Sequence, residues 1–150
     1  MPVQILKYQD HLKIISDSNS KKVFDPIRKK YVILSPEEFV RQLFIVYLRE
    51  KLKIPIKHIA VEREIKINNK KHRFDILVFD KNAKPKLIIE CKSHKINLTE
   101  AVAIQVSKYN IALKADYLCI TNGISSLFYK IDYTKHSIDN IDITKLKRQL

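Results

Sequence analysis

Three charged residues near the middle of the chain have the types and spacing of a reactive site. Asp75 lies inside one apolar run, and Glu90 and Lys92 lie at the end of a second apolar run, residues 87–92. Residues two apart on a strand point to the same face, so Glu90 and Lys92 share one face, and Asp75 can join them if the two runs pair. Charges at the ends of buried strands are costly unless they are compensated, and a divalent metal ion would compensate them. The pattern therefore predicts the site of a metal-dependent phosphodiesterase.

The predicted metal ligands are the carboxylates of Asp75 and Glu90 and the backbone carbonyl of Cys91. Mg²⁺ prefers oxygen ligands and is usually held by one or two carboxylates with water and phosphate oxygens, and Mn²⁺ is expected to substitute for it. Lys92 would orient the attacking water or neutralise charge on the phosphate. The structural alternative is that Asp75 pairs with Arg73 or a nearby lysine and that Glu90 and Lys92 form a same-face ion pair.

The first helix is predicted from its N-terminal signal. Ser35-Pro36-Glu37-Glu38 has a capping serine, a proline at the first helical position and a glutamate three residues after the serine. This is the pattern of a capping box, and it predicts a helix that runs to about Lys53.

The elements after this helix form a strand-rich series. Residues 58–67 alternate between apolar and polar, and Asn68-Asn69 favours a tight turn into a second strand, so a hairpin is predicted. The later predictions are a central strand at 86–92, a helix at 97–114 capped by Asn97 with Glu100, and strands at 115–121 and 126–132. The strand–helix–strand passage predicts a right-handed crossover with parallel pairing. The expected fold class is α/β, a mixed sheet flanked by helices.

The ends of the chain give weaker signals. Weak strand character is found at residues 4–8 and 12–16, a loop is predicted at 24–28, and a short helix is expected in the polar tail from Thr144. We expect one domain over residues 1–150, with an extension at 1–21, a core at about 22–132 and a tail at 133–150.

Composition narrows the class of partner. Lys and Arg number 29 against 16 Asp and Glu, a net charge of +13, which favours a polyanion such as nucleic acid over a merely solvated basic surface. Gly123 is the only glycine, so phosphate-binding loops and dinucleotide fingerprints are excluded, and no nucleotide cofactor or ATP-driven motor is expected. Cys91 and Cys119 lie in apolar runs without a Cys-x-x-Cys motif, which indicates buried, reduced thiols of a cytoplasmic protein. No apolar run approaches the length of a membrane span.

The second predicted helix carries two further candidates. Gln105 and Tyr109 are four residues apart, one turn along one helix face, from which they could reach the site or a nucleotide. The alternative is a buried tyrosine beside a hydrogen-bonded glutamine.

Taken together, these motifs resemble the PD-(D/E)XK nuclease superfamily, and more closely the N-terminal nuclease domain of type I restriction enzyme R subunits. The resemblance covers roughly residues 22–123 and rests on six segments: 24–31, 35–42, Arg73-Phe74-Asp75, Glu90-Cys91-Lys92, 105–110 and Thr121-Asn122-Gly123. It implies a restriction-endonuclease-like αβββαβ core.

The resemblance also implies roles for single residues. Asp75 and Glu90 would bind the metal, Lys92 would be the catalytic lysine, and Gln105 with Tyr109 would support the site. Phe74 replaces the proline that often precedes the first acid, a departure that such nucleases tolerate. Relatives often add a glutamate from the first helix, for which Glu38 matches best and Glu37 is the other possibility, although Glu38 is also the capping-box residue.

The expected function is a Mg²⁺-dependent endonuclease acting on DNA, of restriction, defence or DNA-processing type. The expected partners are DNA and either a second copy of the chain or separate motor or specificity proteins. One alternative is a non-catalytic nucleic-acid-binding or assembly module on a nuclease fold, and another is a structure-selective, resolvase-like homodimer. His94 follows the catalytic strand and could approach DNA, although a solvated loop histidine is the simpler interpretation.

Overall fold

A computed structural model describes residues 3–143, 146 and 150, without the side chain of Tyr109. The elements in chain order are η1 (Leu6–His11), β1 (Ile14–Ser16), β2 (Lys21–Asp25), β3 (Lys30–Ile33), α1 (Pro36–Glu50), η2 (Ile56–His58), β4 (Ile59–Ile67), β5 (Lys70–Phe79), β6 (Pro85–Cys91), α2 (Glu100–Tyr109), η3 (Asn110–Ala112), β7 (Tyr117–Thr121), β8 (Ser126–Asp132) and β9 (Ser137–Asn140). The η elements are short 3₁₀ helices.

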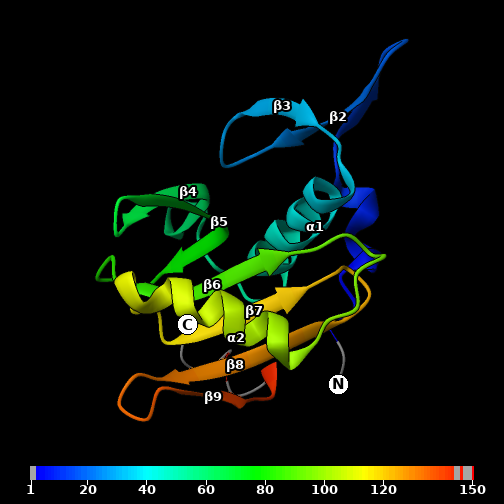
Figure 1. The fold of residues 1–150 in the computed structure, drawn as a ribbon. Helices are drawn as coiled ribbons and strands as arrows, with labels where there is room; N and C mark the ends of the chain where they lie inside the picture. The colour runs from blue at the N-terminus through cyan, green and yellow to red at the C-terminus, as the bar shows by residue number, and fades with distance from the viewer. Residues whose placement is uncertain (1–2, 144–145, 147–149) are drawn as a thin grey trace.

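The main sheet has six strands in the order β4-β5-β6-β7-β8-β9, and β1-β2-β3 form a small separate sheet (Figure 1). All neighbours in the main sheet are antiparallel except β6 and β7, which are parallel. The parallel pair is joined through α2, as the strand–helix–strand pattern predicts, and the mixed α/β fold and the central place of β6 are confirmed.

A helix covers each face of the main sheet. Leu43 and Phe44 of α1 pack against strand side chains on one face: Ile76, Leu87, Ile89 and Cys91. Ala103 and Val106 of α2 pack against strand side chains on the other face: Leu77, Ile88, Leu118 and Ile120. Both faces of β6 are therefore buried, which explains its near-continuous apolar run.

Helix α1 starts where its capping signal predicts. The Ser35 hydroxyl accepts a hydrogen bond from the Glu38 N–H at 3.1 Å, and Pro36 is the first helical residue. The reciprocal half of a capping box is not formed, because the Ser35 N–H donates to the Ile33 carbonyl at 3.1 Å. The Glu38 side chain is therefore available for other contacts. The helix ends at Glu50 rather than near Lys53.

The β4–β5 hairpin is confirmed together with its turn. Asn68 and Asn69 have φ values of 49° and 63°, the left-handed region that a two-residue hairpin turn needs and that asparagine tolerates. Gly123, with φ at 89°, turns the chain between β7 and β8.

Four local predictions are wrong. Residues 4–8 do not form a strand, because Leu6–His11 is a 3₁₀ helix. The predicted loop at 24–28 includes the last residues of β2, which pairs with both β1 and β3. The second helix is capped by Thr99, whose hydroxyl accepts from the Val102 N–H at 3.4 Å, and not by Asn97. That helix begins later than expected and its α-helical part ends at Tyr109.

The tail contains a strand that its polar sequence does not reveal. β9 pairs with β8, with Ile138 opposite Ile131. The helix predicted from Thr144 falls on residues that lie largely outside the described part of the chain. Among the described residues, no helix is long and apolar enough to cross a membrane.

Candidate active site

The candidate site lies where β5 and β6 separate. The last backbone pair in this direction joins Ile76 to Ile89. Beyond this pair the Cys91 N–H donates to a side chain, because Asp75 Oδ2 accepts its hydrogen bond at 2.7 Å. The Asp75 carboxylate thus takes the place of a backbone carbonyl of β5. Asp75 is thereby fixed beside the end of β6, and its side chain remains 16% exposed.

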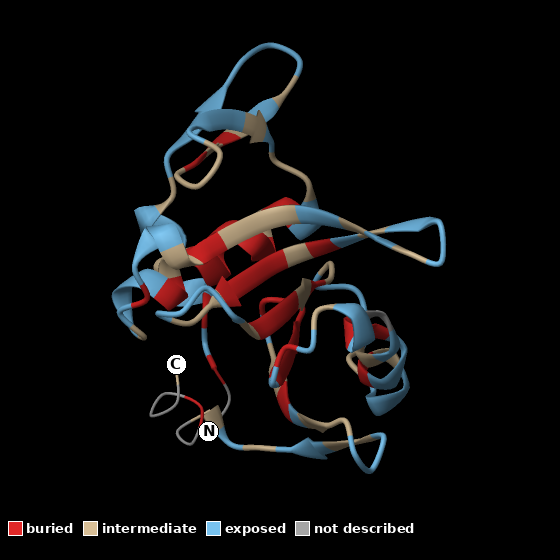
Figure 2. Ribbon diagram, turned by 90° about the vertical axis from the view of Figure 1, so that its left-hand side faces the viewer, coloured by how far each residue is buried: buried red, intermediate tan, exposed pale blue. Residues whose placement is uncertain are grey.

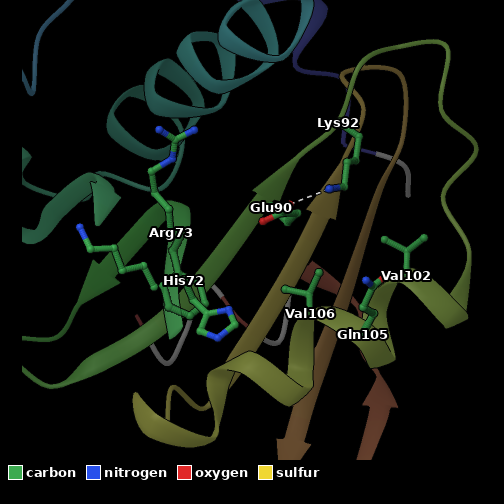
Figure 3. A pocket seen from close by; sticks show the side chains of 9 residues that line it. His72, Arg73, Glu90, Lys92, Val102, Gln105 and Val106 are labelled. Atoms are coloured by element: carbon green, nitrogen blue, oxygen red, sulfur yellow. Dashed lines mark hydrogen bonds and ion pairs between the residues drawn. The ribbon is translucent and has the colours of Figure 1, made fainter. Parts of the chain in front are cut away.

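Glu90 and Lys92 lie on the α2 face of the sheet, as their spacing predicts. The Lys92 ammonium donates to Glu90 Oε1 at 2.6 Å (Figure 3). Cys91 points to the opposite face with Leu87 and Ile89. The same-face ion pair of the structural alternative is therefore present.

The charges of this group perturb one another. Burial and the nearby negative charge of Asp75 raise the pKa of Glu90 above its ordinary value, against the opposing effect of Lys92. Burial by itself would lower the pKa of Lys92, but the hydrogen bond and charge of Glu90 raise it. The negative charge of Asp75 contributes to both pKa shifts. Asp75 therefore acts on Glu90 and Lys92 through its charge and not through a hydrogen bond to either.

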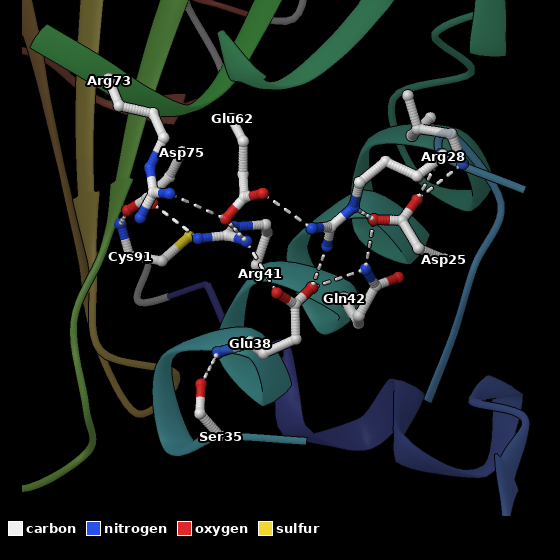
Figure 4. Close-up of polar contacts among 11 residues, drawn as sticks. Asp25, Arg28, Ser35, Glu38, Arg41, Gln42, Glu62, Arg73, Asp75 and Cys91 are labelled. Atoms are coloured by element: carbon white, nitrogen blue, oxygen red, sulfur yellow. Dashed lines mark hydrogen bonds and ion pairs between the residues drawn. The ribbon is translucent and has the colours of Figure 1, made fainter. Parts of the chain in front are cut away.

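Arg41, from α1, is the partner of Asp75 that sequence reasoning missed. Its Nη2 donates to Asp75 Oδ1 at 2.7 Å (Figure 4). The structural alternative named Arg73 instead, but Arg73 approaches Glu62, at 3.6 Å. Both Asp75 oxygens are thus engaged, one by a guanidinium and one by a backbone N–H.

Glu38 lies in an ionic network on the α1 side (Figure 4). Its carboxylate receives Arg28 and Arg41, each at 2.7 Å, and Gln42 at 2.9 Å. Arg28 also binds Asp25, and through Arg41 the network reaches Asp75. Glu38 is connected to the site through this arginine rather than by direct contact. Glu37 is exposed on the same helix.

Glu62 is a further acid of this network, and it was not among the candidate residues of the sequence analysis. It accepts from Arg28 at 2.9 Å and from Arg41 at 3.2 Å. The pairs on either side, Val61 with Ile76 and Arg63 with Phe74, place Glu62 opposite Asp75, yet this pair is not formed and Glu62 has φ at 50°. A positive φ is strained for glutamate. The position of the Asn68-Asn69 turn sets this register, so the sequence contained a signal that could have identified Glu62.

A pocket of about 360 Å³ opens on the α2 side (Figure 3). Its lining residues are Lys71, His72, Arg73, Phe74, Glu90, Lys92, Val102, Gln105 and Val106. Gln105 therefore lies at the same pocket as Glu90 and Lys92. The side chain of Tyr109 is outside the described part of the structure, and His94 is exposed.

The donor set suits a hard divalent cation. Asp75 and Glu90 provide carboxylate oxygens beside the Cys91 backbone, and Mg²⁺ needs only one or two carboxylates. Among the described residues, no group of three or more His, Cys, Asp or Glu side chains is arranged to hold a metal. Water and phosphate oxygens would therefore complete the coordination. In this structure Asp75 Oδ1 accepts a hydrogen bond from Arg41, and Glu90 Oε1 accepts one from Lys92.

The two cysteines are free and buried, as predicted. Burial raises the pKa of both thiols well above the ordinary value, which disfavours the thiolate. Neither Cys91 nor Cys119 is therefore suited to act as a nucleophile.

Comparison with known proteins identifies the family. A search of curated proteins found no significant match. The sequence profile described as the type I restriction enzyme R protein N terminus matches residues 36–143, a range that includes α1, the hairpin, β6, α2 and β7–β9. The matched range includes every candidate site residue named above from α1 onward and covers more than half of the chain. The chain therefore belongs to the family of type I restriction enzyme R protein N termini.

Proposed function

We propose that this protein is a Mg²⁺-dependent endonuclease of the PD-(D/E)XK type that hydrolyses phosphodiester bonds in DNA. The observation that carries the proposal is that Asp75 is held at the backbone of Cys91, between Glu90 and Lys92 in the chain, where β5 leaves β6. The Glu90–Lys92 pair lines an adjacent pocket together with Lys71 and Arg73. Membership of a restriction enzyme family supports DNA as the substrate.

Each side chain then has a defined task. Asp75 and Glu90, with the Cys91 carbonyl, would hold the ion, and Mn²⁺ would replace Mg²⁺. When bound, such an ion lowers the pKa of water and polarises a phosphate. Lys92 lies 2.6 Å from Glu90 and donates to the attacking water or to the phosphate oxygens as negative charge develops there.

The surrounding residues position substrate and acid. Lys71 and Arg73 line the pocket and would bind the DNA backbone, and Gln105 faces the same space from α2. Arg41 and the Cys91 N–H fix the orientation of the Asp75 carboxylate. Glu38 and Tyr109 complete the proposed site, Glu38 through its contact with Arg41.

The second candidate function is a non-catalytic nucleic-acid-binding module. The observation that favours it is the neutralisation of the acids by protein cations: Arg41 binds Asp75, and Lys92 binds Glu90. In this case the charged groups would stabilise the fold, while the basic surface would still bind DNA.

A cleavage assay separates the two functions. Wild-type protein is incubated with duplex, single-stranded and branched DNA in Mg²⁺, Mn²⁺ or EDTA, beside Asp75→Asn, Glu90→Gln and Lys92→Ala. We expect metal-dependent cleavage that each substitution abolishes, while Asp139→Asn, a change at an exposed acid on β9, retains it. DNA binding without cleavage of any substrate by the wild type would favour the binding module.

A further inference from the structure

The β4–β5 hairpin carries a strongly basic surface, of which the proposed active site uses only Lys71 and Arg73. Residues 63–73, which we call the basic ribbon, contain five Lys or Arg side chains and one acid, Glu64. All six of these charged residues are exposed, and the Lys71 and Arg73 side chains are 64% and 61% exposed. The ribbon therefore presents a net positive charge of four to solvent.

The ribbon stands clear of the sheet. Backbone pairing between β5 and β6 ends at Ile76, so within the described residues the segment beyond it pairs only with β4. Figure 2 shows it projecting from the body of the molecule with an exposed tip. A free two-stranded ribbon is only marginally stable. This one is supported at its base, where Phe74 and Ile65 pack against the core on the α2 side.

The β5 strand of the ribbon also forms one wall of the pocket. Lys71, His72 and Arg73 line the pocket that contains Glu90 and Lys92. A polyanion bound along the ribbon would therefore continue into the candidate active site. This continuity distinguishes the ribbon from other exposed lysines, such as Lys81 and Lys84 in the turn at the opposite end of β5.

The dimensions of the ribbon match duplex DNA. Five residue pairs, from Arg63–Phe74 to Ile67–Lys70, lead to the turn, and at about 3.3 Å per residue they span ~17 Å. Both strands of DNA together carry one charge per ~1.7 Å of axis, so this length covers about five base pairs. The major groove is ~12 Å wide and admits a two-stranded β-ribbon.

We propose that the basic ribbon binds the phosphate backbone of duplex DNA over several base pairs beside the bond presented for cleavage. This inference rests on the proposed function only in taking DNA as the ligand. The ribbon positions the duplex and takes no part in the chemistry.

The test is the salt dependence of binding, measured by fluorescence anisotropy with a labelled duplex in EDTA between 50 and 200 mM salt. The variant is Lys66→Gln/Lys70→Gln, whose residues lie on the ribbon but do not line the pocket. The slope of log K against log salt is negative, and each lost phosphate contact reduces its magnitude by ~0.9. We therefore expect the magnitude to fall by ~2 and the affinity to be at least tenfold weaker near ~0.1 M salt.

The matched control is Lys81→Gln/Lys84→Gln, which changes the net charge equally at the other end of β5. We expect its slope to stay within ~0.5 of wild type, as no phosphate contact is lost. Equal losses in both double variants would overturn the proposal, because net charge alone would then explain binding. The proposal would also be overturned if Lys66→Gln/Lys70→Gln bound DNA with the affinity and salt slope of wild type.

Folding is checked by the urea unfolding midpoint. If the double variant does not fold, Lys70→Gln alone should reduce the magnitude of the slope by ~0.9, and an unchanged slope counts against the ribbon. Because binding is measured without metal, this result is independent of the cleavage assay. A wild type that binds through the ribbon but never cleaves would refute the proposed enzyme and leave the ribbon standing.

Discussion

Replacing Arg41 by methionine should strongly destabilise the fold, because one buried guanidinium holds three acids. The Arg41 side chain is 5% exposed, and it donates to Glu38 and Asp75 at 2.7 Å and to Glu62 at 3.2 Å. Methionine retains most of the apolar stem, so the loss is mainly electrostatic. Breaking a buried ion pair by removing one partner costs about 3–5 kcal/mol, because a charge remains buried without compensation.

The lower end of that range applies here. Glu38 keeps Arg28 and Gln42 as partners, and the Asp75 side chain, 16% exposed, still reaches water. We therefore expect a loss of about 3 kcal/mol in the free energy of unfolding. For a domain of this size that corresponds to a melting temperature lower by ~6–12 °C. Domains have only about 5–15 kcal/mol in total, so the change is large.

The assay is urea unfolding followed by circular dichroism. Arg49→Met is the matched control, since Arg49 is exposed on the same helix and its loss should cost no more than ~0.5 kcal/mol. The double variant Arg41→Met/Glu38→Met also removes one of the carboxylates that lose their partner in Arg41→Met. Its cost should be smaller than the sum of the two single costs by ~1 kcal/mol or more. A cost below ~1 kcal/mol for Arg41→Met would show that the network contributes little and would refute this reasoning.

Two further predictions follow from the site and from a helix cap. The pKa of Glu90 is raised from its ordinary value of 4.5, so wild-type stability falls as pH rises from that value through the raised pKa. Glu90→Gln should therefore unfold in EDTA at pH 7 at the same or a higher urea concentration than wild type, while it loses the cleavage that wild type shows in Mg²⁺. A clear loss of stability would instead mark the pair with Lys92 as structural. Thr99→Ala should cost about 1 kcal/mol or less, given its long 3.4 Å cap bond, whereas Asn97→Ala should be neutral in the same unfolding assay; the reverse ranking would contradict the observed cap.

Local signals were sufficient for much of the fold and for the core of the candidate site. The serine–proline start of α1, the Asn68-Asn69 turn and the apolar run of β6 depend on residues near one another in sequence, so their effects can be read without a tertiary partner. The same holds for Glu90 and Lys92, because strand periodicity alone places them on one face.

Weak or short elements could not be predicted in the same way. The N-terminal sheet consists of strands three to five residues long, and β9 is polar and four residues long. Such segments become strands because a neighbour supplies backbone partners, as β8 does for β9. Their stability is a property of the pair rather than of the segment.

The partners of the acids were decided only by the tertiary structure. Strand periodicity placed Glu90 and Lys92 on one face, and pairing of the two apolar runs was enough to bring Asp75 near them. The sequence by itself could not determine that Arg41, thirty-four residues away, would hold Asp75, or that Arg28 would join Glu38 to Glu62. Long side chains of either sign can pair with many partners, and only the packing of α1 against the sheet selects among them.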